Sequence, residues 1–239
     1  MSDRILEVAD LGLVPYGEAL ERQRRLADDR IAGRLPHDTL LLLEHPPVVT
    51  LGRGTRQSSL PVDPEALRRR GVDVFEIERG GDVTFHGPGQ LVGYPIFDLT
   101  QHRQDLHWFL RQLEAALIMA LGDLGIPAEP RAGYTGVWTG GRKIASIGIH
   151  VRQWVTWHGF ALNVTTDLAA FDLIVPCGIP DVVMTSVAKE LEDRRAEMQT
   201  LSGDRLSAAV RQAVVSAFVA TFGFNHSTSE EGTRMGLGG

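Results

Sequence analysis

Strand and helix patterns alternate along the chain, and this alternation limits the possible folds more than any other feature of the sequence. Short apolar runs typical of strands lie at 5–11, 39–43, 47–51, 72–77 and 91–97, and helical spacings lie at 15–34, 64–70 and 105–124. From residue 134 the pattern becomes that of a hairpin, in which a two-glycine turn joins 134–138 to 143–151. A strand at 154–164 and a helix at 204–222 follow. We therefore predict an α+β chain with a mixed, largely antiparallel sheet flanked by helices.

The organisation of the chain favours a single domain. Its 239 residues are enough for one well-buried core, and we find no internal repeat or linker that would divide them. We expect one domain over 1–225 and a disordered tail over 226–239, because the tail is polar and rich in glycine.

Composition excludes several classes of protein. No apolar run reaches the ~20 residues of a membrane span, and the first residues lack a signal-peptide pattern. The one cysteine cannot form an internal disulfide, and a net charge of −6 argues against general nucleic-acid binding. We expect a cytoplasmic protein that binds neither membranes nor nucleic acids.

The segment from Arg79 to Gln90 reads Arg-Gly-Gly-Asp-Val-Thr-Phe-His-Gly-Pro-Gly-Gln, and it is the first candidate site. Its four glycines allow the backbone to approach a ligand closely, and Arg79 and His86 supply polar groups. It matches neither the dinucleotide fingerprint nor the phosphate loop. The alternative is a tight turn between two strands, but the length of the segment and its two ionisable side chains favour a site.

Lys143 is a candidate base. Only two of the 24 basic residues are lysines, so a position that keeps lysine is a candidate for a role that needs a removable proton. Lys143 opens a hairpin strand and shares a face with Ala145 and Ile147 if the strand alternates regularly. Desolvation on such a face lowers the pKa of an amine. The alternative is a solvated lysine at the end of a hairpin.

Cys177 is a candidate nucleophile. It lies between Pro176 and Gly178, in a bend that fixes the direction of the sulfur, and the amides that follow are available to an oxyanion. The alternative is a small buried apolar side chain. The histidines show no metal-ligand spacing, so we predict neither a metal nor a cofactor.

Four segments together resemble the lipoyl(octanoyl) transferase family: 79–90, 141–148, 158–163 and 176–179. The resemblance extends over about 6–190. It implies transfer of an octanoyl or lipoyl group from acyl carrier protein to the acceptor lysine of lipoyl domains. These domains belong to 2-oxoacid dehydrogenase complexes and to the glycine cleavage H protein. The resemblance also implies that Cys177 holds the acyl group as a thioester, that Lys143 activates Cys177, and that no cofactor takes part.

The resemblance further implies a fold like the catalytic domain of biotin and lipoate protein ligases, and it assigns the lining of the acyl site. The implied lining is Arg79, Gly80, Gly81, Asp82, Val83, Thr84, Phe85, His86, Ser146, Ile147, Gly148, Gly159, Phe160 and Ala161. Two alternatives remain open at this point. An ATP-dependent lipoate or biotin protein ligase shares the fold and does not need Cys177, and a non-catalytic acyl- or carrier-binding protein would leave Cys177 inert.

Docking of an acidic carrier to this acidic chain requires a local basic face. The candidate arginines are Arg53, Arg56, Arg68, Arg69, Arg70, Arg142 and Arg152. For the run 68–70 the alternative is a solvated helix end.

Overall fold

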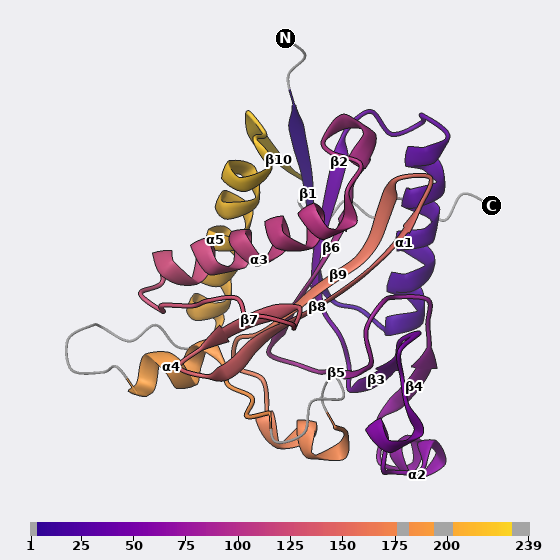
Figure 1. Ribbon diagram of the computed structural model, residues 1–239, viewed down its shortest axis with the longest axis vertical. Helices are drawn as coiled ribbons and strands as arrows, with labels where there is room; N and C mark the ends of the chain where they lie inside the picture. Colours follow the sequence, from indigo (N-terminus) through magenta and orange to yellow (C-terminus); the bar gives the residue numbers. More distant parts are fainter. Residues whose placement is uncertain (1–3, 176–181, 194–202, 231–239) are drawn as a thin grey trace.

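A seven-stranded mixed sheet forms the centre of the molecule (Figure 1), in the strand order β10-β1-β2-β6-β9-β8-β7. The computed structural model describes residues 4–175, 182–193 and 203–230. The strands of this sheet are β1 (Ile5–Leu13), β2 (Asp38–Glu44), β6 (Gln90–Ile96), β7 (Gly136–Thr139), β8 (Arg142–Arg152), β9 (Val155–Asn163) and β10 (His226–Glu230). The pairs β10–β1 and β1–β2 are parallel and the other four pairs are antiparallel, so the predicted fold class is confirmed.

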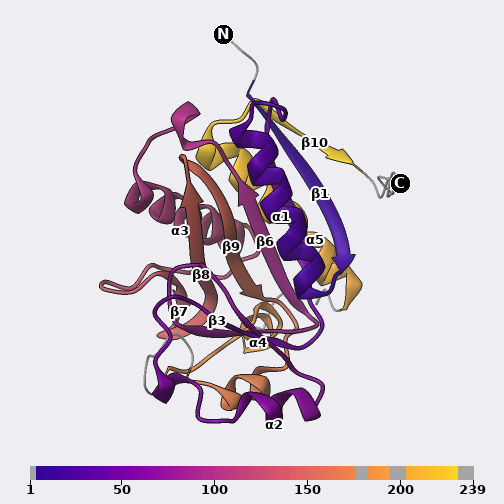
Figure 2. The same ribbon diagram turned by 90° about the vertical axis from the view of Figure 1, so that its right-hand side faces the viewer.

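Helices cover both faces of the sheet. Helix α1 (Tyr16–Ile31) lies on one face, and α3 (Leu106–Asp123) and α5 (Asp204–Phe222) lie on the other (Figure 2). The four leucines of β2 show the division, because Leu40 and Leu42 pack with α3 and α5 while Leu41 and Leu43 pack with α1. A strand buried on both sides is apolar throughout rather than alternating, as this one is.

The helix ends agree with their sequence signals. Asp105 caps α3 by accepting a hydrogen bond from the amide of Trp108 at 3.0 Å. Gly223 ends α5 in the left-handed conformation, with a φ of 68°. The hairpin turn between β7 and β8 uses Gly140 and Gly141, both with positive φ.

A second, three-stranded sheet lies beside the first and was not expected from the sequence. Its order is β4 (Asp73–Glu76), β3 (Val48–Leu51) and β5 (Val83–His86). It packs against α2 (Pro64–Arg69) and the short helix η3 (Leu168–Leu173) through an apolar cluster that includes Val49, Leu67 and Phe171. The glycine-rich segment 79–90 is therefore not a loop throughout, because β5 lies within it and pairs with β3.

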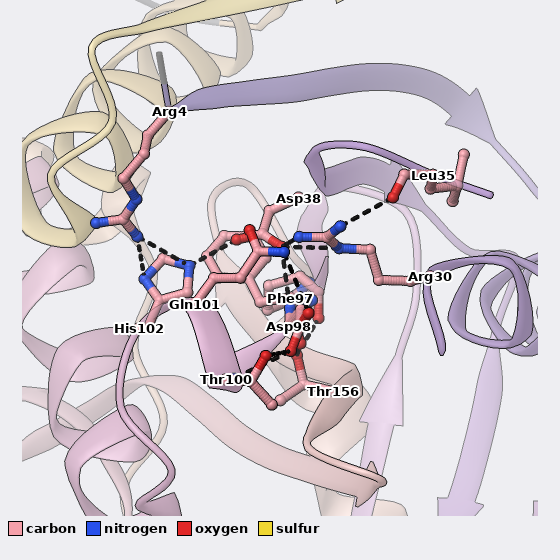
Figure 3. A network of polar contacts seen from close by, with 11 residues as sticks. Arg4, Arg30, Leu35, Asp38, Phe97, Asp98, Thr100, Gln101, His102 and Thr156 are labelled. Carbon is pink, nitrogen blue, oxygen red and sulfur yellow. Dashed lines mark hydrogen bonds and ion pairs between the residues drawn. The ribbon is translucent and has the colours of Figure 1, made fainter. Parts of the chain in front are cut away.

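A buried polar network joins the N-terminal strand to the rest of the sheet (Figure 3). Asp38 Oδ1 accepts hydrogen bonds from Arg30 Nη2 at 3.0 Å and from the Asp98 amide at 2.9 Å. Its other oxygen lies 2.6 Å from His102 Nε2. Since that nitrogen donates to the carboxylate, Nδ1 of His102 accepts from Arg4. These contacts link β1, α1, β2 and the short helix η2 (Leu99–Gln101).

Two further elements differ from the sequence expectation. The first five residues of the expected tail form β10, because their backbone pairs in parallel with the outer edge of β1, from Ile5↔His226 to Ala9↔Glu230. Their polar side chains gave no strand signal because an edge strand need not be apolar. Helix α4 (Val187–Asp193) was also not predicted. Within the described residues no helix is both long and apolar enough to span a membrane.

Candidate active site

A cavity of about 220 Å³ opens between the two sheets, where β5, β8 and β9 meet. Twelve residues of the predicted acyl and catalytic site line it: Arg79, Gly81, Asp82, Thr84, His86, Lys143, Ser146, Ile147, Gly148, Gly159, Phe160 and Ala161. These twelve residues span 82 positions (161 − 79) and contribute to one cavity.

Three residues of the predicted site do not line the cavity. Val83 and Phe85 alternate along β5 with Thr84 and His86, so their side chains pack into the apolar cluster of the smaller sheet. Gly80 contributes its backbone instead, and its amide donates to the carbonyl of Ile149 at 2.9 Å.

The glycines of the site allow backbone segments to approach each other closely. A Cβ on Gly148 would lie 2.8 Å from the carbonyl oxygen of Gly80, and a Cβ on Gly159 would lie 2.1 Å from that of Gly93. Any side chain at these positions would push the 79–82 segment or β6 away from the walls of the cavity.

Arg79 holds the segment that begins with it. Its guanidinium donates to the carbonyl and the hydroxyl of Thr50, both at 2.8 Å, and to the carbonyl of Asp82 at 2.7 Å. The side chain is buried, so these contacts fix the turn between β4 and β5 as well as placing a positive charge beside the cavity.

Lys143 lies on β8 with its side chain fully buried, and its Nζ is 5.3 Å from the centre of the Trp138 ring. The regular alternation expected for this strand is interrupted, because Val137 pairs with Ala145 while Trp138 pairs with Lys143. This bulge places one extra residue, Ile144, between the two pairs. Lys143 therefore shares the cavity with Ser146, while Ile144 and Ala145 join the main core.

Cys177 lies outside the described residues, but both flanks of its segment are described. On the near side, the amide of Val175 donates to the carbonyl of Ser59 at 2.9 Å. The hydroxyl of Ser59 donates to Asp82, a cavity residue, at 2.6 Å. On the far side, the Lys143 amide donates to the Val183 carbonyl at 2.8 Å, and the Thr185 amide donates back to the Lys143 carbonyl at 2.9 Å. The far flank of segment 176–181 is thus bonded to a cavity residue, and the near flank is bonded to Ser59, whose hydroxyl contacts a cavity residue.

The cavity also contains polar rings that are neutral at pH 7. Burial lowers the pKa of His158 to about 3 and holds that of His86 well below its usual value. Burial likewise raises the pKa of the Tyr16 and Tyr94 hydroxyls. Arg79 is a charged residue beside these uncharged groups. The uncharged groups are compatible with an apolar ligand in the same cavity.

Glu78 lies behind the cavity wall. Burial favours its neutral form, but hydrogen bonds from Arg24, from its own amide and from Trp157 outweigh burial and lower the pKa of Glu78 to about 2. Its carboxylate lies 4.0 Å from His158 Nε2. His158 itself adopts a positive φ of 57°, an uncommon conformation for a residue inside a strand.

Sequence reasoning missed several lining residues, namely Tyr16, Tyr94, Gly133, Tyr134, Thr135 and His158. His158 opens the motif 158–163, but the lining implied by the resemblance begins at Gly159. Tyr16 and Tyr94 lie on α1 and β6 in patterns that read as ordinary core faces, so their spacing gave no sign of a site.

Comparison with known proteins agrees with this geometry. The family described as the lipoyl protein ligase A/B catalytic domain matches residues 15–215. Among solved structures, the bipartite lipoate protein ligase of Thermoplasma acidophilum has a TM-score of 0.67 at 18% identity, over 97% of this chain and 88% of that one. A lipoate-protein ligase A bound with ATP gives the same TM-score at 17% identity, over 97% and 90%. The fold and the site thus define a lipoyl ligase or transferase catalytic domain.

Sequence relatives identify the family within that class. An octanoyltransferase of Gloeobacter violaceus is 60% identical over 168 residues, which cover 70% of this chain and 73% of the relative. One from Synechococcus elongatus is 47% identical over 222 residues, 93% of this chain and 89% of the relative. The chain belongs to the octanoyltransferase family and is an acyltransferase, as the four motifs indicated.

Proposed function

We propose that this chain transfers an octanoyl or lipoyl group from acyl carrier protein to the acceptor lysine of lipoyl domains, through a thioester on Cys177. The observation that carries the proposal is the anchoring of both flanks of Cys177 at the cavity. Cys177 is two residues beyond Val175, and two residues of extended chain reach at most about 7 Å. This short reach supports the proposal that the Cys177 thiol and the Lys143 amine act in one site.

In the first half-reaction Lys143 takes the proton of the Cys177 thiol, and the sulfur attacks the thioester carbonyl of the donor. The bond between the acyl carbon and the carrier sulfur breaks, and the carrier thiolate leaves with the proton held by Lys143. Backbone amides near Gly178 stabilise the oxyanion. The acyl group is then bound to Cys177, and the carrier is released as a free thiol.

In the second half-reaction the amine of the acceptor lysine attacks the acyl-enzyme. An amide bond forms, the bond to Cys177 breaks, and the sulfur leaves as a thiolate. Lys143 takes the proton that the acceptor amine loses and passes it to this thiolate. Each step exchanges one acyl bond for another, so the reaction needs no ATP. The cavity of about 220 Å³, whose lining includes Ile147, Phe160 and Ala161, provides the space for the acyl chain.

For the carrier we propose docking on the loop that contains Arg53 and Arg56. Both side chains are exposed, and within the described part of the chain neither forms an ion pair. The loop packs on the cavity wall, because the Gly54 amide donates to the Gly81 carbonyl at 2.9 Å. By contrast, Arg68 pairs with Glu65, and Arg142 pairs with Glu190. Arg53 and Arg56 are thus the basic residues best placed to meet an acidic donor.

The experiment that tests the proposed reaction offers the enzyme two donors. With octanoyl carrier protein and no ATP, we expect octanoylation of a lipoyl domain, or of the glycine cleavage H protein. With free octanoate and ATP we expect none. Product formed only in the second mixture would identify an ATP-dependent ligase, and carrier binding without product in either mixture would identify a binding protein.

A further inference from the structure

Gln90 and Asn163 end two of the four sequence motifs, and the proposed reaction gives neither of them a role. They face each other across the β6–β9 pair, and each side chain is 1% exposed. Buried amides at paired positions need partners for all their polar atoms. Their partners connect two parts of the active site.

The two amides lie in one run of hydrogen bonds. Gln90 Oε1 is 2.8 Å from His86 Nδ1, and Gln90 Nε2 donates to Asn163 Oδ1 at 2.9 Å and to the Phe85 carbonyl at 3.2 Å. Asn163 Nδ2 then donates to the Thr185 carbonyl at 3.0 Å. The run extends from a ring that lines the cavity to the segment that pairs with Lys143.

Backbone carbonyls fix the direction of every bond in the run. The carbonyls of Phe85 and Thr185 only accept, so the amide nitrogens of Gln90 and Asn163 must face them. Asn163 Oδ1 consequently accepts from Gln90, and Gln90 Oε1 remains as the acceptor for His86. His86 must therefore donate from Nδ1.

The tautomer of His86 follows. Burial holds the pKa of His86 well below its usual value, so the ring carries one proton, and that proton is on Nδ1. Nε2 is left with a lone pair on a ring that lines the cavity. The polar wall thus offers a hydrogen-bond acceptor at this ring.

At its other end the run holds the chain that returns from Cys177. Thr185 is fully buried, and its hydroxyl donates to Glu190 at 2.6 Å. Its amide donates to the Lys143 carbonyl at 2.9 Å. With the carbonyl bound by Asn163, both backbone polar groups and the side chain of Thr185 are held.

We propose that Gln90 and Asn163 are positioning residues of the transfer reaction, which keep the proton of His86 on Nδ1 and hold segment 183–185 against Lys143. The proposal rests on the proposed function, and it adds the residues that keep the Lys143 strand and the cavity wall in a fixed arrangement. Neither side chain touches the acyl group in this account. They act through His86 and Thr185.

The test combines a spectroscopic and a kinetic measurement on the full-length enzyme. Nitrogen-15 NMR of the histidine rings is expected to show His86 protonated at Nδ1 in the wild type and in Gln90→Glu, which keeps an acceptor. Gln90→Met removes that acceptor, and the Nδ1–H form should no longer dominate. In Gln90→Met and Asn163→Leu we expect kcat to fall about tenfold to a hundredfold, with KM for octanoyl carrier protein little changed.

Thr156→Val is the matched control. Thr156 lies on the same strand as Asn163, is fully buried, and its hydroxyl donates to the Pro95 carbonyl at 2.8 Å. We expect this variant to lose stability but to keep the His86 tautomer and a kcat within about twofold of wild type.

A wild-type spectrum with the proton on Nε2 would overturn the proposal, as would an unchanged kcat in folded Gln90→Met and Asn163→Leu. If the substituted enzymes do not fold, the wild-type spectrum alone still decides the tautomer. A wild type that forms no product would reject the proposed function instead, while the His86 spectrum would continue to test the hydrogen-bonded run.

Discussion

Lys143 and Thr185 are joined through the backbone, because the Thr185 amide donates to the Lys143 carbonyl at 2.9 Å. This contact places the chain that leaves segment 176–181 directly beside the strand of Lys143. On the other flank, Val175 is bound to Ser59, whose hydroxyl binds Asp82. Both described flanks of segment 176–181 are therefore bonded to residues that line the cavity or lie next to it.

Replacing Lys143 by Arg tests its role as a proton acceptor. Arginine keeps a positive charge but does not release its proton near neutral pH. We expect the rate of octanoyl transfer by Lys143→Arg to fall by about 10²-fold or more. The rate is measured with octanoyl carrier protein and a lipoyl domain, after circular dichroism has verified the fold. A rate close to that of the wild type would mean that Lys143 supplies charge only.

The close approach at Gly159 predicts a stability effect. A methyl group there would meet the Gly93 carbonyl at 2.1 Å, so Gly159→Ala should lower the free energy of unfolding by about 1–3 kcal/mol or more. Gly122→Ala is the control, because Gly122 lies in α3 with no atom within 4 Å of the added Cβ. It should raise stability by up to about 1 kcal/mol. Urea titration measures both changes. Equal free energies of unfolding for Gly159→Ala and Gly122→Ala would show that β6 and β9 do not approach each other this closely at Gly159.

Buried histidines predict a pH dependence of stability. Burial lowers the pKa of His45 from 6.5 to about 4 and that of His158 to about 3. Between pH 6.5 and pH 4 the unfolded chain therefore binds protons that the folded chain does not. The free energy of unfolding should fall as the pH decreases through this range, by up to ~1.4 kcal/mol per pH unit for each such histidine.

His45→Gln tests this pH dependence. The glutamine side chain does not titrate, so the dependence should become shallower even if the variant is less stable throughout. Urea titrations at several pH values give the slope directly. A slope that is the same in wild type and variant would show that His45 binds its proton equally well in both states.

Carrier docking is tested by charge reversal at the cavity wall. Arg53→Glu combined with Arg56→Glu should raise KM for octanoyl carrier protein, and more strongly at low salt than at high salt. Arg68→Glu is the control, because Arg68 already pairs with Glu65 on α2. An equal effect of both changes, or one that does not vary with salt, would contradict docking at the 53–56 loop.

The elements with strong local signals could be predicted from the sequence. Three residues each mark a helix end: the proline that precedes α1, Asp105 before α3 and Gly223 after α5. Each does so through local conformation or local hydrogen bonding, which needs no residue distant in the sequence. The β7–β8 hairpin was indicated by its two glycines. These features are local, so a single sequence contains them.

The parts that depend on distant partners could not be predicted. Strand β5 lies within a glycine-rich segment and is defined by its pairing with β3. Strand β10 is polar and exists through its pairing with β1. In the site, Tyr94 reads as a core residue, and the bulge at Ile144 is visible only in the pairing with β7. The motifs identified the walls of the cavity because their order is specific to the family. Spacing alone did not show that Thr84 lines the cavity while Val83 packs into the apolar cluster of the smaller sheet.

The thioester on Cys177 is tested most directly by intact-protein mass spectrometry after mixing the enzyme with octanoyl carrier protein. The account predicts that the wild type gains the mass of one octanoyl group, that hydroxylamine removes it, and that adding a lipoyl domain transfers it. Cys177→Ala should gain no mass. An octanoyl adduct that persists in Cys177→Ala would contradict the account, and so would a wild type that forms product without ever showing the adduct.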